Sequence, residues 1–218
     1  MGVATLAVTE QSMVKQERAA RTRETLIRSA AQIFDREGFS VASLTGISSL
    51  AGVSNGALHF HFASKAALAD AVEAAALTRL LAVTDAGPTP GAGRVQRLVD
   101  VTHGLAAALR SDVVLRAGFE LSGEPSRVSQ SDLRERWRRW VQETLERADA
   151  EGELHPEVAA RDVVTAVVAA TVGFEVLGAR DAVWLSESTV ARFWRLLLPT
   201  LVPAALLAEL DVEGTHQS

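Results

Sequence analysis

Residues Ile47–Phe62 read ISSLAGVSNGALHFHF, and this stretch decides the fold of the surrounding chain. Ser43, just before it, is suited to cap a short helix, because a serine hydroxyl accepts a hydrogen bond from a free N–H of the first turn. Gly52 ends that helix, since glycine tolerates a positive φ, and Ser54 caps a second helix over 55–61. Two short helices joined by a tight glycine turn predict a helix-turn-helix.

The second helix of this pair has the features of a segment that approaches DNA. It begins with Asn55, Gly56 and an alanine, small residues that allow its N-terminus to come close to a phosphate backbone. Asn55 and His59 are one turn apart and are expected to face outward toward base edges or phosphates. The apolar residues expected to anchor the helix to its neighbours are Leu58, Phe60 and Phe62.

The two histidines in the same stretch raise the possibility of a metal site. His59 and His61 are two residues apart, which on a helix separates their directions by about 200°, whereas ligand pairs need a spacing of three or four. The chain has no cysteine, and it contains no nucleophile elbow, HExxH motif or P-loop. We therefore predict no metal site, no cofactor and no catalytic residues.

Charge is distributed unevenly along a chain of 218 residues with a net charge of −5. Up to residue 65 there are seven basic and five acidic side chains, and after it fifteen arginines face twenty-two acids. A slightly basic N-terminal part on an acidic remainder is typical of a small DNA-binding unit attached to another kind of domain. Ordinary scatter of surface charge gives the same small excess, so this signal is weak alone.

Almost the whole chain has a helical period of apolar residues, and no convincing strand pattern occurs, so the fold class is all-α. A helix over 18–37 is expected to stop at Gly38. The loop near 85–93 connects two helices, and Pro199 and Pro203 are expected to kink or divide the last helical stretch. The other helices are predicted over 64–81, 94–109, 113–121, 130–150, 156–178 and 187–210.

Two features of the sequence bear on the cellular compartment. The first 14 residues lack the positive start and apolar core of a signal peptide. The most apolar run, 163–178, is shorter than the about 20 residues that a membrane span requires, and it contains Glu175. We therefore predict a soluble, cytoplasmic protein that does not contact a membrane.

The run from Arg21 to Phe62, continued by ASKAAL, resembles the DNA-binding region of the TetR family of bacterial repressors. That pattern has a glycine after the first helix and then G-V-S/T-x-G-x-aromatic-x-H/Y-F-x-x-K-x-x-L. The sequence departs from it at His59, where tyrosine is common, and at Asn55, often lysine. The residues that keep the pattern are Gly38, Phe39, Ile47, Ala51, Gly52, Val53, Ser54, Gly56, Phe60, His61, Phe62, Lys65 and Leu68.

The resemblance implies contacts with double-stranded operator DNA. Lys65 is expected to hold a phosphate as a point charge, and Arg18 and Arg21 are expected to reach a phosphate or the minor groove, unless they lie on a solvated helix face. The complete set of implied DNA contacts is Arg18, Arg21, Thr45, Ser54, Asn55, Gly56, His59, His61 and Lys65.

Three features of the sequence, two stretches and one spacing, resemble one branch of that family, the γ-butyrolactone autoregulator receptors. They are GALHFHFASKAALADAV, the element VLRAGFELSGE over 114–124, and the spacing from Trp137 to the apolar helix of 163–178, followed by Phe193 and Trp194. The resemblance implies that Trp137 packs on a small amphiphilic ligand and that Thr171 can hydrogen-bond its polar group.

Simpler interpretations of these residues remain open at this stage. Trp137 can cover a helix seam, and the Thr171 hydroxyl can bond the carbonyl one turn back. Glu175 can pair with Arg180 or Arg192, or it can line the pocket. Further residues that can face the pocket from their helices, each better suited to the core than to a ligand contact, are Leu115, Phe119, Val141, Val167 and Phe174.

The sequence thus predicts a disordered tail over 1–14, a helix-turn-helix DNA-binding domain over 15–63, and a ligand-binding and dimerisation domain over 64–218. A long helix joins the two domains, and the apolar, alanine-rich last helices are expected to form the seam of a homodimer. The predicted function is a ligand-released repressor. Two alternatives remain: a pseudo-receptor that senses an antibiotic or another apolar ligand, and a helical small-molecule binding protein whose DNA-binding part is vestigial.

Overall fold

The computed structural model describes residues 2–86 and 91–215, and within these ranges it contains helices and no strand, so the all-α prediction is confirmed. Residues 87–90 of the predicted loop at 85–93 lie outside the described residues. The elements are α1 (Gly2–Val41), α2 (Leu44–Leu50), α3 (Asn55–His61), α4 (Lys65–Thr84), α5 (Arg94–Ser111), α6 (Val113–Ser122), α7 (Leu133–Ala150), α8 (Ala160–Gly178), the short 3₁₀ helix η1 (Ala182–Leu185), α9 (Glu187–Leu201) and α10 (Ala204–Leu207).

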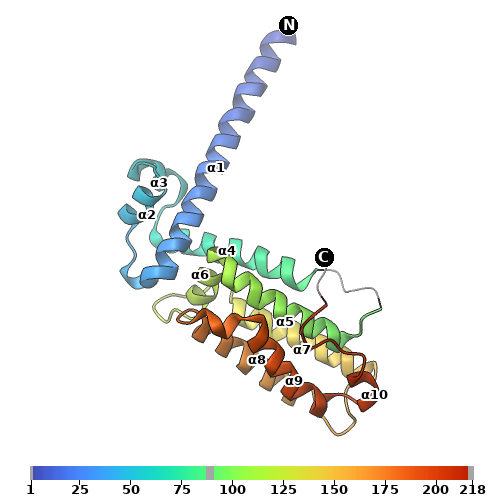
Figure 1. Ribbon diagram of the computed structural model, residues 1–218. Coiled ribbons are helices and arrows are strands. Elements are labelled where there is room, and N and C mark those ends of the chain that lie inside the picture. Colours follow the sequence, from blue (N-terminus) through green and yellow to red (C-terminus); the bar gives the residue numbers. More distant parts are fainter. Residues whose placement is uncertain (1, 87–90, 216–218) are drawn as a thin grey trace.

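Helix α1 is longer than the sequence pattern indicates, and its first turns project beyond the rest of the molecule (Figure 1). The prediction of a disordered tail over 1–14 differs from this, because the helix begins at Gly2. The segment has no proline and no glycine after its first residue, so nothing in it stops a helix that forms further along. The expected break at Gly38 is present, with φ 76° and ψ 159°.

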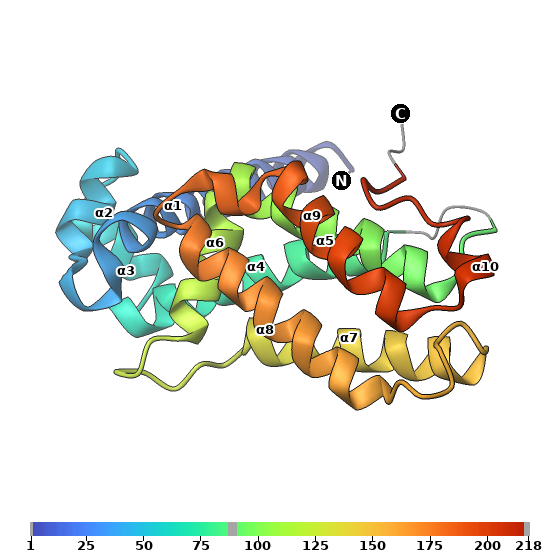
Figure 2. The ribbon, with the colours of Figure 1, turned by 60° about the horizontal axis from the view of Figure 1, so that its bottom comes forward.

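The first three helices, which we call the head, lie at one end of the molecule, with α2 and α3 beside α1 (Figure 1). Helix α4 leads from the head along the remaining helices, α5–α10, which we call the body (Figure 2). Helix α6 packs against both α1 and α4, so it is the element of the body that contacts the head and the connecting helix together.

The starts and ends of the body helices follow local chemistry. Helix α7 begins at Leu133, three residues later than predicted, because the Asp132 carboxylate accepts a hydrogen bond from the N–H of Glu135 at 3.0 Å. Pro203 divides the last helical stretch into α9 and α10 as predicted, whereas Pro199 stays inside α9 near its C-terminal end.

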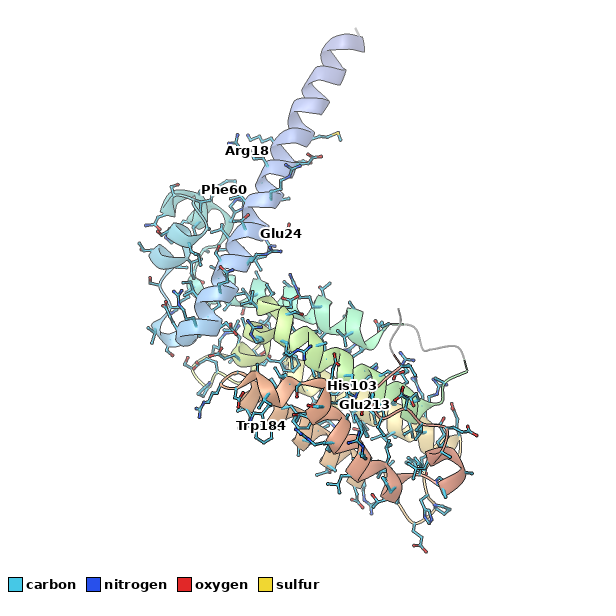
Figure 3. The ribbon with its side chains drawn as sticks, viewed as in Figure 1. Arg18, Glu24, Phe60, His103, Trp184 and Glu213 are labelled. Carbon is cyan, nitrogen blue, oxygen red and sulfur yellow. The ribbon has the colours of Figure 1, made fainter. Side chains whose placement is uncertain are left out.

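The chain after α10 returns to α5. The Gln96 side chain bonds both the N–H and the carbonyl of Asp211, at 2.8 and 3.0 Å. The ring of His103 lies 2.9 Å from the Val212 carbonyl, and Figure 3 shows His103 on α5 near Glu213 of this returning segment. The C-terminal segment is therefore held by side chains of α5 and covers one edge of the body.

One apolar core runs from α1 in the head to α9 in the body. Its largest fully buried side chains include Trp137, Trp194 and Phe34. Over the described residues, none of the helices has the length and apolar character needed to cross a bilayer.

Candidate nucleic-acid interface and ligand core

The helix-turn-helix has the geometry that its sequence predicts. The Ser43 hydroxyl accepts from the Gly46 N–H and the Ser54 hydroxyl accepts from the Ala57 N–H, each at 3.1 Å. Gly52 adopts φ 67° between the two helices, and the Val53 N–H donates to the Ser48 carbonyl at 3.0 Å. The turn is thus fixed by bonds between residues close in sequence.

Helix α3 presents a different side chain to solvent than expected. Leu58 and Phe62, one turn apart, are buried as predicted, but Phe60 is 82% exposed, so its predicted role as an anchor is wrong. Residues 58 and 60 point about 200° apart on a helix, so they cannot both face the core. The exposed Phe60 ring meets the edge of His61, with ring centroids 5.3 Å apart, and Figure 3 labels it on α3.

Most of the predicted DNA contacts lie on the surface of the head. His61 is half-buried, and Arg21 forms only a loose pair with Glu17 at 3.7 Å. The side-chain amide oxygen Oδ1 of Asn55 accepts from the Ser48 hydroxyl at 2.6 Å, so this side chain is tied to α2. The exposed members of the set are Arg18, Arg21, Thr45, Ser54, Asn55, Gly56 and His59.

Lys65 has different partners from those expected. Its ammonium donates to the carbonyls of Phe39, Ser40 and Ala42, at 2.7, 3.2 and 2.9 Å, and it also lies over the Phe39 ring at 4.7 Å. An ammonium has three donors, and these bonds use all of them. In the absence of DNA, Lys65 thus ties the start of α4 to the chain that follows the kink in α1, and its contact with phosphate stays a prediction.

A buried ion cluster next to Lys65 was not predicted from the sequence. Arg127, in the loop between α6 and α7, pairs with Glu73 at 2.7 Å and with Asp70, both on α4. The side chain of Glu73 is 0% exposed and that of Arg127 is 6% exposed. Ser129 adds a hydroxyl hydrogen bond to the Glu73 carboxylate at 2.8 Å. The cluster therefore joins α4 to the loop that leads into α7.

Arg127 is also connected to the head. Its guanidinium lies 5.7 Å from the centre of the Phe39 ring, the same ring that Lys65 contacts. Burial lowers the pKa of Arg127, but its bonds to Glu73 and Asp70 outweigh this and raise the pKa overall. It therefore stays charged, and the ion cluster contacts the head, α4 and the body at one point.

The two principal ligand candidates meet in the body. The indole Nε1 of Trp137 on α7 donates to the Thr171 hydroxyl on α8 at 2.7 Å, and that hydroxyl donates to the Val167 carbonyl at 2.8 Å. Trp137 is 1% exposed and its ring stacks on Trp140, with centroids 5.3 Å apart. Both simpler interpretations are thus realised, because the tryptophan fills a helix seam and the threonine bonds one turn back.

The other ligand candidates belong to the same packed region. Phe174 is half-buried and meets Phe193 edge to face, with centroids 5.7 Å apart. Trp137 and Thr171 line neither of the two cavities of about 910 and 630 Å³, but the smaller one lies between α7 and α8 and is lined by their neighbours Arg138 and Val172. The hydrogen-bonded pair itself is thus buried, with a cavity next to it on the same pair of helices. The fully buried candidates are Leu115, Phe119, Val141 and Val167.

The structure also shows the partner of Glu175, which the sequence left open. Glu175 pairs with Arg134 of α7 at 3.0 Å, not with Arg180 or Arg192, and it lines the larger cavity. Burial raises the pKa of Glu175, and Arg134 acts in the opposite direction. In the part of the chain that the structure describes, no group of three His, Asp or Glu side chains is placed to hold a metal ion.

Comparison with known proteins agrees with this arrangement of head and body. The family model of the bacterial regulatory proteins of the tetR family matches residues 26–72. The chain is 31% identical to the A-factor receptor protein of Streptomyces griseus over 206 residues, which cover 93% of this chain and 71% of the relative.

Solved structures extend the similarity to the body. A γ-butyrolactone receptor described as ArpA-like is 29% identical, with a TM-score of 0.77 over 88% of this chain and 94% of that chain. CprB of Streptomyces coelicolor, solved with its biological operator sequence, is 28% identical, with a TM-score of 0.75 over the same shares of the two chains. This chain belongs to the TetR family, in the branch of the A-factor and γ-butyrolactone receptors, and is a ligand-responsive DNA-binding regulator.

Proposed function

We propose that this regulator is a homodimeric repressor that binds double-stranded operator DNA through α3 and is released by a small amphiphilic signal of the γ-butyrolactone type. The observation that carries the proposal is the hydrogen bond of 2.7 Å between Trp137 and Thr171, deep in the body. It joins a broad apolar ring to a hydroxyl, which is the combination that a ligand with an apolar tail and a polar ring requires.

The burial of Trp137 suggests how such a signal acts. A ligand that packs on this indole has to displace side chains of α7 or α8, since the indole is 1% exposed and lines neither of the two cavities described above. The ligand therefore binds an opened body better than the closed one. A ligand shifts an equilibrium only through such a difference in affinity, and a coupling of about 1–3 kcal/mol is usual in allosteric proteins.

The route to the head is supported by the contacts of α4 and α6. Helix α7 starts just after the loop that carries Arg127, and Arg127 is paired to Glu73 on α4. A shift of α7 would move this loop and with it the helix that leads to α3. We propose that the shift changes the distance between the two heads of a dimer and removes their fit to successive major grooves.

Support for a homodimer comes from the last helices of the body. A folded monomer rarely exposes several large apolar side chains close together. A two-fold interface would bury these residues and place two copies of α3 on one operator. The exposed apolar residues of α8, η1 and α9 are Val176, Leu177, Val183, Trp184 and Leu196.

The remaining assignments follow from this role. We propose that residues 15–63 form the DNA-binding domain, that 64–218 bind ligand and partner subunit, and that the regulator works in the cytoplasm on chromosomal DNA as a binding protein rather than an enzyme. The proposed operator contacts include Asn55 and His59. We add the exposed ring of Phe60 to them, because it lies on the same short helix.

A gel shift with DNA from the region upstream of the gene tests the proposal. Addition of a γ-butyrolactone extract is expected to release the wild-type protein but not Trp137→Phe, which retains a ring but lacks the indole donor. Thr171→Val serves as the partner variant and is expected to respond weakly. Release of all three proteins to the same extent would contradict the assignment of the ligand core. No release of any of them would favour the pseudo-receptor alternative, and no binding of DNA would contradict the operator role at that promoter.

A further inference from the structure

The larger cavity, of about 910 Å³, lies where the head meets the body and is separate from the Trp137–Thr171 pair. Its walls come from α1, α5, α6, α7 and α8 and from η1, and its volume lies in the range of 300–1,000 Å³ that is typical of small-molecule pockets. The charged side chains that line it are Asp35, Arg110, Arg116, Glu120, Glu124, Arg134, Glu175 and Arg180.

Two bidentate ion pairs shape the inner wall. Arg116 of α6 donates to both carboxylate oxygens of Asp35 on α1, at 3.0 and 3.1 Å, so this pair joins the head to the body. Arg134 of α7 donates to Glu175 of α8 at 3.1 and 3.2 Å. Both guanidinium groups already hold a carboxylate in the geometry that suits them best.

The guanidinium of Arg134 lies directly against the backbone of Gly123. A Cβ at this position would meet that guanidinium, so a larger residue would make the arginine side chain shift.

Glu120 of α6 is the carboxylate of this wall that has no hydrogen bond or ion pair with the described residues. Partial burial and then the carboxylates of Asp35, Glu175 and Glu124 raise its pKa, Arg134 acts in the opposite direction, and the net result is a pKa of about 7. Three of the four charged groups that act on Glu120 are therefore carboxylates, so its immediate surroundings favour a cation.

The rest of the lining is apolar or exposed. Leu109 and Leu185 are buried side chains that reach the cavity, and Val176 belongs both to this lining and to the face proposed above for the partner subunit. Arg110 and Arg180 are exposed, as Glu120 is, but neither is among the charged groups that shift the pKa of Glu120. We propose that this cavity is a second effector site, distinct from the Trp137 core, that binds an amphiphilic organic amine with its ammonium group on Glu120 and its hydrocarbon part on Leu109 and Leu185.

A ligand at this position would touch both parts of the regulator. Asp35 belongs to α1 of the head, and Glu120, Arg134 and Glu175 belong to three helices of the body. An amine on Glu120 therefore binds best to the arrangement of head and body that keeps this wall intact, which adds a second input to operator binding. This regulatory consequence rests on the proposed function, whereas the binding of the amine does not.

Isothermal titration of the full-length protein with three probes of one skeleton tests the site: octylammonium, octanol and octanoate. Octylammonium is expected to bind about tenfold more tightly than octanol, because a charge-assisted hydrogen bond is worth at least one power of ten in affinity. Glu120→Gln is expected to remove this preference. The matched control is Glu157→Gln, which removes an exposed carboxylate far from the cavity lining and should leave the titration unchanged.

Several results would overturn the proposal. They are equal binding of octanol and octylammonium, an unchanged preference in a folded Glu120→Gln, no binding of octylammonium, and tighter binding of octanoate, which would indicate an anion site on Arg110 and Arg180. Trp137→Phe separates the two sites, since it should keep the affinity for octylammonium and lose the response to butyrolactone. Circular dichroism and thermal unfolding of each variant establish that it is folded.

Discussion

The head and the body of this regulator hold their polar groups in different ways. In the head, the bond from the Ala57 N–H to the Ser54 hydroxyl spans three residues and is open to solvent. In the body, the Trp137–Thr171 bond spans 34 residues and the Arg127–Glu73 pair spans 54, and both are buried. Local bonds at the surface form readily and contribute little each, whereas distant buried pairs are costly to break.

This difference suits the two tasks of the molecule. The head has to present α3 in one fixed shape, and caps next to the turn achieve this without help from the body. The body has to exist in two arrangements, and a few buried pairs between helices are contacts that a ligand can alter together. Variants that remove either a local surface bond or a distant buried pair therefore test whether the two kinds of bond differ in their contribution to the free energy of unfolding.

The largest effect is expected for Arg127→Ala. The change leaves the Glu73 carboxylate, which is 0% exposed, without its guanidinium partner, so we expect a loss of about 3–5 kcal/mol in the free energy of unfolding. Urea unfolding at a fixed protein concentration measures it.

The matched control for that variant is Arg139→Ala, which removes an exposed arginine paired with Glu135 four residues away. Such surface pairs contribute less than about 1 kcal/mol. Equal losses of unfolding free energy in the two variants would show that the buried ion cluster stabilises the body no more than a surface ion pair does.

A smaller loss is expected for Thr171→Val, which deletes the hydroxyl that accepts from Trp137. The buried indole N–H is then left without an acceptor, at a cost of about 1–3 kcal/mol. A double-mutant cycle with Trp137→Phe measures the coupling, because the double variant has no unpaired donor. Additive losses in the cycle would mean that the bond contributes nothing beyond packing.

The same contrast explains what the sequence could predict. Caps and glycine turns act within three or four residues, so Ser43, Gly52 and Ser54 are recognisable in the sequence and the helix-turn-helix follows from them. The Arg127–Glu73 pair leaves no local pattern, because its two residues are brought together only by the packing of α4 against the loop before α7. The Trp137–Thr171 pair was accessible only through the family resemblance.

One error and one unpredicted set of contacts in the head have local signals in the sequence. Phe60 and Phe62 are two apart on a short helix, so only one of them could face the core with Leu58. Lys65 follows a chain segment that ends at Gly38 and leaves carbonyls without helical partners, and such carbonyls attract an ammonium. Counting the free carbonyls at this helix end would have indicated the structural role of Lys65.

Ser54→Ala tests a local bond of the head. It deletes the cap of α3, and we expect a loss of about 1 kcal/mol in unfolding free energy, less than for either buried pair. Urea unfolding and a gel shift on the same samples compare stability with operator affinity. If Ser54→Ala lost more unfolding free energy than Thr171→Val, the comparison would fail, because a local bond of the head would then stabilise the protein more than a buried bond of the body.

Phe60→Ala separates DNA contact from stability in the head. Since the ring is 82% exposed, its removal should change the free energy of unfolding by less than about 0.5 kcal/mol. If the ring contacts the operator, affinity in a gel shift should fall about tenfold, as expected for the loss of one good contact to a base. A stable variant with unchanged affinity would exclude Phe60 from the interface.

The smallest effect concerns the pH dependence of stability at the junction of head and body. The pKa of Glu120 is raised from an ordinary 4.5 to about 7, so between these values the folded protein keeps a proton that the unfolded chain releases. The free energy of unfolding should therefore fall as the pH rises through this window. Subtracting the profile of Glu120→Gln isolates this contribution from that of Glu175, whose pKa is also raised. Identical profiles for the two proteins would show that Glu120 is solvated like an ordinary surface acid, and a flatter profile for the variant would locate the retained proton on Glu120 itself.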